Sequence, residues 1–95
     1  MDTKAFEDRL RAEGYTEIMT RTVDKAMQTP LHTHPFDAFA MILDGEMSVV
    51  CGDKSVTCHA GDTFQLAAGL EHFESYGEKG ATYLVGRRMA PAKAA

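Results

Sequence analysis

The segment that is most informative about the fold reads Leu31-His32-Thr33-His34-Pro35-Phe36-Asp37. It carries two of the four histidines in a chain of 95 residues. Alternate side chains of an extended strand point to the same face, so His32 and His34 project together while Thr33 points away. Two imidazoles on one face can hold a metal ion, and His72, in a second apolar stretch, is a third candidate. Taken alone, the His-x-His pair is more typical of two ordinary surface histidines.

The residues around these histidines form two spaced motifs. The first reads His32-x-His34-x3-Ala38-x6-Gly45, and the second reads Gly61-x5-Ala67-x-Gly69-x2-His72-x3-Tyr76. Together they resemble the paired motifs of the cupin superfamily, over roughly residues 28 to 86. The chain is therefore identified as similar to small single-domain cupins of the cupin 2 type.

The resemblance implies both a fold and a metal site. The implied fold is all-β, a small double-stranded β-helix or jelly-roll barrel. The implied ligands are His32, His34 and His72, holding one divalent metal ion per chain. Imidazole suits several such ions, so Zn, Fe, Ni, Co, Mn and Cu all stay open.

Three positions depart from the family pattern. Ala38 stands where many cupins place a ligand glutamate, Ala67 replaces the usual proline of the second motif, and Tyr76 replaces its usual asparagine. The missing glutamate leaves either a site of three histidines or one that another carboxylate completes.

Glu74 is the acidic residue best placed for that role, because it lies two residues after His72 and shares its face in a regular strand. It is predicted to complete the coordination shell or to act as the catalytic general base. The alternative is an outward glutamate after a bulge. Asp37 is off parity with His34, but a bulge at Pro35 would turn it inward as a ligand or as a partner that orients an imidazole.

Other polar residues near the motifs have simpler interpretations. His59 is expected to be exposed and not a ligand. Glu71 and Tyr76 are expected at the rim, where Tyr76 could hydrogen-bond a ligand. Phe64 and Tyr83 are interpreted as packed core.

The remaining pattern predicts a helix over residues 1–14, a barrel over 15–88 and a flexible tail over 89–95. Phe6 and Leu10 lie four apart on the helix, and Asp44-Gly45 is the strongest hairpin signal. In the continuously apolar stretch 38–43, Phe39, Met41 and Leu43 share a face that is expected to pack outward. A second sheet or a partner chain would cover it, which predicts a homodimer.

Composition excludes several classes of partner. The net charge is −4 and the few basic residues are scattered, which argues against nucleic acid. No apolar run reaches the roughly 20 residues of a membrane span. Cys51 and Cys58 flank a tight turn with unequal offsets and are expected to stay reduced. The chain is therefore predicted to be cytoplasmic.

These observations favour a metal-dependent protein that takes a small-molecule ligand or substrate. If it is an enzyme, the resemblance implies dioxygenase, isomerase or lyase chemistry. The competing hypothesis is a non-catalytic binding or sensing module of the same fold. A metal-free structural domain is a third, weaker hypothesis.

Overall fold

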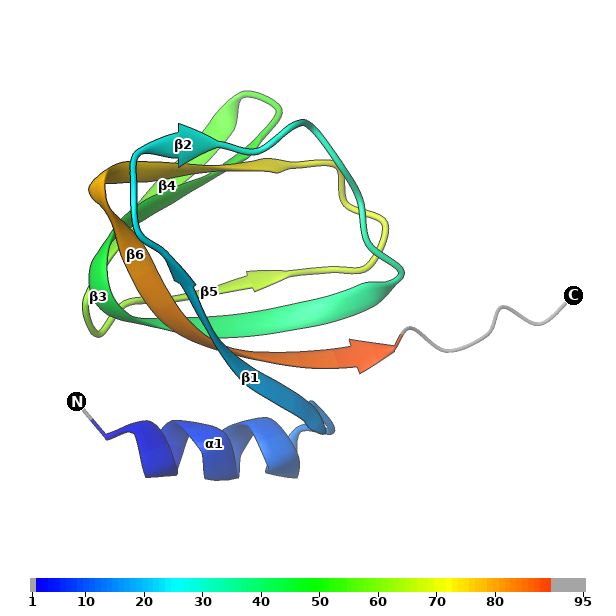
Figure 1. Cartoon of the computed structure of the whole chain (residues 1–95). Coiled ribbons are helices and arrows are strands. Elements are labelled where there is room, and N and C mark those ends of the chain that lie inside the picture. Colours follow the sequence, from blue (N-terminus) through cyan, green and yellow to red (C-terminus); the bar gives the residue numbers. More distant parts are fainter. Residues whose placement is uncertain (1, 90–95) are drawn as a thin grey trace, which may run out of the picture.

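The structure, a computed structural model, describes residues 2–89 and consists of one short helix and an antiparallel sheet curled into a barrel (Figure 1). The elements are α1 (Thr3–Ala12), β1 (Glu17–Val23), β2 (Met27–Gln28), β3 (Phe36–Cys51), β4 (Lys54–His59), β5 (Thr63–Leu66) and β6 (Phe73–Met89). The predicted all-β jelly-roll barrel with a short N-terminal helix is confirmed. The predicted tail over 89–95 lies, apart from Met89, outside the described residues.

The main sheet has the order β1-β6-β3-β4, while β2 pairs with β6 and β5 pairs with β3. The two long strands β3 and β6 pair with each other along most of their length, from Phe36 opposite Met89 to Val50 opposite Phe73. Both strands bend sharply, and in this way each contributes to two sides of the barrel (Figure 1).

The prediction of a hairpin at Asp44-Gly45 was wrong, because β3 continues through this dipeptide. The register shifts twice here, between Ile42 and Asp44 and again between Gly45 and Met47, which marks β-bulges. Gly45 has a φ of 81°, a conformation that glycine supplies both in tight hairpin turns and in bulges of the G1 type. Residues 77–80 likewise lie within a single continuous strand, β6.

The outer face of the sheet is covered by the chain's own helix. Phe6 and Leu10 of α1 pack with Phe39 and Met41 of β3, and the rings of Phe6 and Phe39 meet edge to face with centroids 5.0 Å apart. Asp2 caps the helix by accepting a hydrogen bond from the Ala5 N–H at 3.0 Å. The face that was predicted to need a second sheet or a partner chain is therefore already buried.

The opposite face of β3 points into the barrel, as the alternation of side chains predicted. Ala38, Ala40 and Ile42 belong to the inner core. Because Ala38 and Ala40 are small, this part of the wall leaves space inside the barrel. The core residues that surround it are Met47, Val49, Cys58, Leu66, Tyr76, Ala81, Tyr83 and Val85.

Both cysteines are free, as expected, since Cys51 is opposite Lys54 and Cys58 is opposite Met47. Within residues 2–89 no helix is both long enough and apolar enough to cross a membrane.

Candidate metal centre

Backbone pairing between two loops brings the histidines together. The N–H of His32 donates to the carbonyl of His72 at 2.9 Å, and the N–H of His72 donates to the carbonyl of His32 at 3.0 Å. The same two loops are joined by a third hydrogen bond, in which the Gly69 N–H donates to the His34 carbonyl at 2.9 Å. His34 itself lies in the loop before β3 rather than in a strand. Residues 40 positions apart in the sequence, 32 and 72, thus become direct neighbours.

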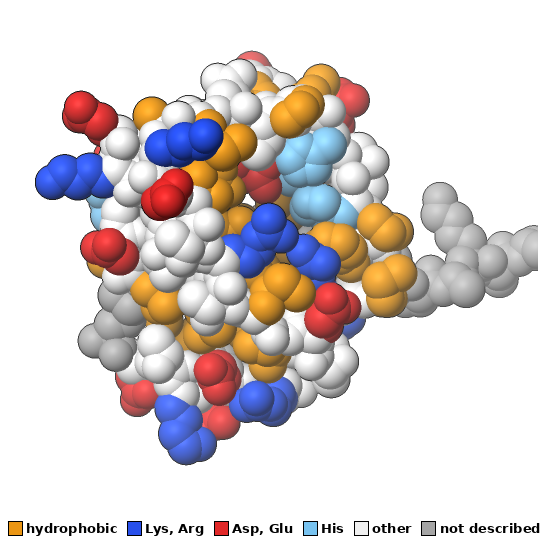
Figure 2. All heavy atoms as spheres, viewed as in Figure 1, with side chains coloured by type: hydrophobic (Ala, Val, Ile, Leu, Met, Phe, Trp, Pro, Cys, Tyr) orange, Lys and Arg blue, Asp and Glu red, His pale blue; other side chains and the backbone are white. Residues whose placement is uncertain are grey.

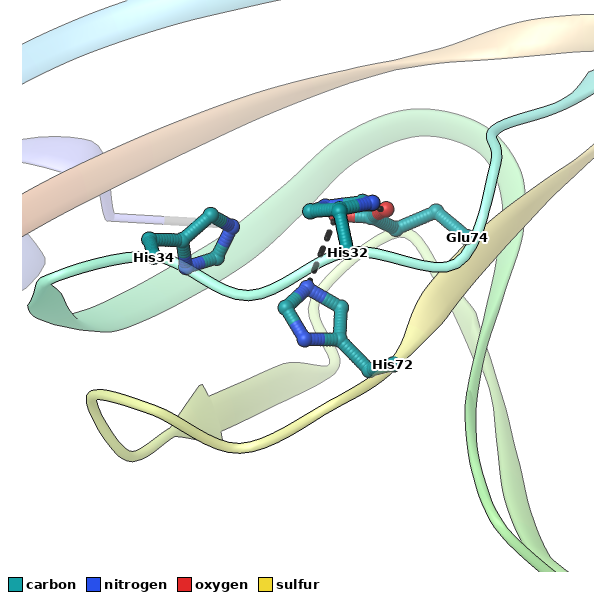
Figure 3. Close-up of side chains that lie close together, drawn as sticks. All are labelled: His32, His34, His72 and Glu74. Carbon is teal, nitrogen blue, oxygen red and sulfur yellow. Dashed lines mark ion pairs between the residues drawn. The ribbon is translucent and has the colours of Figure 1, made fainter.

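The three imidazoles cluster and Glu74 closes the group (Figure 3). The ring centroids of His32 and His72 are 4.4 Å apart, and those of His34 and His72 are 4.7 Å apart. One potential ligand atom from each of the four side chains lies within 4.8 Å of all the others. Three nitrogens and one carboxylate oxygen at such spacing could hold one metal ion.

Hydrogen bonds fix which nitrogens of two histidines face the centre. Nδ1 of His32 is 2.7 Å from the Pro30 carbonyl, and Nδ1 of His72 is 2.8 Å from the Leu70 carbonyl. A carbonyl oxygen only accepts, so each Nδ1 carries the proton, and in the neutral ring each Nε2 presents a lone pair. Orientation of an imidazole by a backbone carbonyl is typical of histidines that bind metals.

Those lone pairs face a carboxylate. Nε2 of His32 lies 3.4 Å from Glu74 Oε2, and Nε2 of His72 lies 3.6 Å from Glu74 Oε1. Groups that all accept hydrogen bonds repel one another unless a proton or a cation lies between them. Nε2 of His72 and Nδ1 of His34 are also buried with no hydrogen-bond partner in residues 2–89. Such orphaned atoms are rare in folded proteins, and these residues fit a bound cation.

The surroundings of His34 favour its neutral form. Its ring stacks on Phe36 with centroids 4.4 Å apart and an angle of 6° between the planes. Burial lowers the pKa of His34, and the neighbouring His72 and His32 lower it further. A neutral imidazole keeps the lone pair that a metal requires.

Thr29, which belongs to neither sequence motif, positions the carboxylate of Glu74. Its hydroxyl donates to Glu74 Oε2 at 3.0 Å and accepts from the Glu74 N–H at 2.9 Å. The Thr29 N–H also donates to the Glu74 carbonyl at 2.9 Å. The side chain of Glu74, which is 12% exposed, is therefore fixed beside His32 and His72.

Asp37 does not join this group. Its carboxylate accepts from the Ala68 N–H at 2.8 Å and from Arg88 Nη2 at 2.9 Å. The Ala68 hydrogen bond, followed by that of Arg88, holds the pKa of Asp37 below its ordinary value. His59 also lies apart, exposed and 2.8 Å from Glu46 Oε1. Tyr76 is buried rather than at the rim, and its hydroxyl lies 3.4 Å from that of Tyr83.

A cavity of about 220 Å³ adjoins three of the four side chains, His32, His34 and Glu74. Figure 2 shows histidine and basic side chains beside a hollow in this face of the barrel, with acidic atoms inside it. Phe64 and Tyr83 were interpreted as core residues. They do pack in the inner core, and they also line the cavity. The lining comprises Arg21, Thr29, His32, His34, Phe36, Ala38, Phe64, Leu66, Glu74, Tyr76, Tyr83, Val85 and Arg87.

Comparison with known proteins agrees with this architecture. A family model described as "Cupin domain" matches residues 19–85, whereas no curated protein matches the chain. A protein of unknown function from Rhizobium leguminosarum bv. viciae 3841 has a similar structure, with a TM-score of 0.72 and 19% identity over 77% of this chain and 69% of its own.

Two further solved structures have the same fold. A cupin-2 domain protein from Shewanella frigidimarina NCIMB 400 has a TM-score of 0.64 and 19% identity over 77% of this chain and 72% of its own. The DMSP lyase DddQ from Ruegeria pomeroyi DSS-3 has a TM-score of 0.69 and 22% identity over 81% of this chain but only 40% of its own. At these identities the likeness shows the fold alone.

Proposed function

Because this chain belongs to the cupin family, we propose that it is a metal-dependent protein that acts on a small molecule, with His32, His34, His72 and Glu74 holding one divalent ion. The observation that carries this proposal is the arrangement of acceptors. Imidazole lone pairs face both oxygens of Glu74, and two buried ring nitrogens have no partner in the described part of the chain. A cation would convert this repulsion into attraction.

The donor set narrows the choice of ion. Three imidazole nitrogens and one carboxylate suit Zn, Fe, Ni, Co, Mn or Cu, whereas Mg and Ca prefer oxygen ligands throughout. When bound, such an ion supplies Lewis acidity and a position at which a ligand oxygen can be polarised. Ala38 of β3 stands where many cupins have a ligand glutamate. In this proposal Glu74, on β6, supplies the missing carboxylate.

The chain's own groups would bind and orient the small molecule. The cavity of about 220 Å³ is smaller than the roughly 300 to 1,000 Å³ of sites for drug-sized ligands, so it suits a compact molecule. Burial, followed by the neighbouring Tyr83, raises the pKa of Tyr76, so this phenol stays protonated and can donate a hydrogen bond. Glu74 borders both the candidate ion and the cavity, which supports its proposed second role as a general base.

A lyase or isomerase reaction, or an oxidation by dioxygen, would each be compatible with this site. One structural neighbour, DddQ, is a lyase. Turnover is tested by loading the full-length protein with each candidate ion in turn. A panel of small oxygen-containing molecules is then followed for cleavage, isomerisation and oxygen uptake.

Glu74→Gln is the decisive variant, and exposed Glu71→Gln is its matched control. If Glu74 holds the ion as proposed, Glu74→Gln weakens ion binding, while Glu71→Gln retains the ion and turnover. If Glu74 acts only as a base, Glu74→Gln keeps the ion and loses turnover. Saturable binding without turnover of any compound would instead support the non-catalytic binding or sensing module.

We further propose a homodimer and a cytoplasmic location. The homodimer is proposed although α1 covers the apolar face formed by Phe39 and Met41. A cytoplasmic location is proposed because Cys51 and Cys58 are both free, as is usual for thiols in reducing compartments.

A further inference from the structure

Two arginines, Arg21 and Arg87, line the same cavity as the candidate ligands His32, His34 and Glu74. Arg21 belongs to β1 and Arg87 to β6, two strands that pair so that Arg21 is opposite Tyr83 and Glu17 is opposite Arg87. Tyr83, Val85 and Arg87 alternate along β6 and therefore share one face. These three side chains and that of Arg21, the neighbour of Tyr83 on β1, all line the cavity. This face of the sheet therefore forms one side of the cavity.

The guanidinium groups of these two arginines have spare donors. Arg87 Nη1 is 3.6 Å from Glu17 Oε1, which is longer than a hydrogen bond, and Arg21 has no hydrogen bond or ion pair with any residue in 2–89. The adjacent Arg88 differs, because it binds Asp37 through two nitrogens and donates to the Glu13 carbonyl at 2.6 Å. Arg21 and Arg87 therefore keep donors available at the cavity.

Arg87 is also anchored close to the candidate metal ligands. Its guanidinium carbon lies 4.6 Å from the centroid of the Phe36 ring, and the same ring stacks on His34. Phe36 therefore holds Arg87 on one side and a candidate ligand on the other. The side chain of Arg87 is 26% exposed, so its charge is only partly screened by water.

The balance of charge favours an anionic ligand. With a divalent ion in place, the ion and the two arginines carry four positive charges, while Glu74 and Glu17 carry two negative ones. A planar guanidinium binds carboxylates and phosphates through paired hydrogen bonds. The cavity lining also includes the apolar side chains of Phe64, Leu66 and Val85, which suits a carbon skeleton.

We propose that the cavity takes a small organic carboxylate, whose carboxylate group binds Arg21 and Arg87 while its carbon skeleton lies against the apolar lining beside the histidines. The net positive charge of the cavity and the placing of the carbon skeleton rest on the proposed metal site. The preference for a carboxylate rests on the two arginines.

The test compares matched probes on full-length zinc-loaded protein. Propanoate and propanamide have nearly the same shape and differ in charge, and methylphosphonate represents a phosphate-like oxyanion. Binding is followed by NMR titration, including the side-chain Nε–H signals of Arg21 and Arg87, and zinc content is measured in the same samples. Propanoate is expected to bind at least about tenfold more tightly than propanamide and to shift both arginine signals.

Arg21→Gln and Arg87→Gln are each expected to weaken propanoate binding about tenfold or more without lowering zinc content. Arg11→Gln on the exposed face of α1 makes the same change in net charge and should bind propanoate as the wild type does. If Arg87→Gln does not fold, Arg21→Gln remains informative, because Arg21 is exposed and its loss leaves no buried contact.

Equal binding of propanoate and propanamide, tighter binding of methylphosphonate, or an Arg21→Gln variant that behaves like Arg11→Gln would each overturn the inference. These failures are distinct from failure of the proposed function. A protein that takes up zinc but does not prefer propanoate overturns the carboxylate alone. A protein that takes up no zinc but shifts its arginine signals with propanoate overturns the metal site alone.

Discussion

Thr29 shows how a single hydroxyl can connect backbone pairing to the chemistry of the site. The hydroxyl accepts from the backbone of Glu74 and donates to its carboxylate. The side chain of Glu74 is therefore ordered before any ion binds, so an ion would meet a carboxylate already in place. Residues that orient ligands in this way typically contribute about 10- to 100-fold to metal affinity.

Thr29→Val removes the hydroxyl and keeps the shape of the side chain. We expect it to weaken zinc binding about tenfold, because Glu74 is then free to rotate away from His32 and His72. Thr33→Val is the matched control, since Thr33 is exposed in the neighbouring loop. Competition titration against a chelator measures both affinities, and equal affinities would show that Thr29 does not act through Glu74.

At this scale the sequence predicted residues that follow a short-range rule. His32 and His34 follow from alternation, and Glu74 follows from its spacing to His72. Thr29 and Arg21 were missed because they reach the cavity through pairing with distant parts of β6, and Arg87, itself in β6, because that strand pairs with the distant β1 and β3. No local pattern specifies such pairing. Asp37 illustrates the converse, because the bulge invoked to turn it inward is absent and alternation alone directs it outward.

Among the elements, β3 and β6 decide the shape of the barrel through their bends. At the bend of β3, Gly45 has a φ of 81°, and a Cβ there would collide with the Gly80 carbonyl. An Asp-Gly pair has the same local preference in a hairpin as in a bulge. Only the continued pairing of β3 with β6 distinguishes the two, which is why the local signal was misinterpreted.

Gly45→Ala should be far more destabilising than Gly52→Ala. Both glycines have positive φ, so both variants incur about 1 to 2 kcal/mol from the left-handed backbone. At Gly52 no atom lies within 4 Å of the added Cβ, whereas at Gly45 the backbone of β6 is in the way. We expect Gly45→Ala to cost at least about 2 kcal/mol more in urea unfolding. Similar losses would mean that the bend tolerates a side chain.

Asp37 joins the start of β3 to the turn before β6 and to Arg88 within β6. Its pKa is lower when folded than when unfolded, so its contribution to stability is present above the unfolded value and disappears as the pH falls through the folded value. Asp37→Asn should therefore lower Tm at pH 7 by about 2 to 4 °C.

The difference in Tm between the wild type and Asp37→Asn should shrink below about pH 4, because the Asp37 carboxyl of the wild type then becomes protonated and loses its charge. Tm measured from pH 7 to pH 3 checks this, with Asp53→Asn in the exposed turn after β3 as the control. A difference in Tm that stayed constant down to pH 3 would show that the charge of Asp37 is not the cause.

At the scale of the whole molecule, the position of α1 decides which apolar surface is left for contact with a second copy. α1 covers Phe39 and Met41, so the apolar surface that remains lies elsewhere. Val56 and Leu70 are 49% and 41% exposed beside a groove of about 530 Å³ next to β4, which is an edge strand of the sheet. The family resemblance and the overall pattern predicted the barrel, but they did not predict which surface α1 would cover.

The homodimer is accordingly expected to form through this edge, since an edge strand beside an apolar groove favours pairing with a second copy. Light scattering at micromolar concentration should give twice the mass of one chain. Val56→Lys should reduce it to the mass of a monomer, whereas Leu31→Lys, at another exposed apolar position, should not. A wild-type protein of monomer mass would contradict the prediction.

The claim on which the whole account depends is that the four converging side chains hold one divalent ion. Elemental analysis of protein purified without a histidine tag and loaded with zinc tests it most directly. We expect one zinc ion per chain in the wild type and in His59→Ala, and a sharp loss in His32→Ala, His34→Ala and His72→Ala. A wild type that retains no zinc, or an equal loss in His59→Ala, would contradict the account.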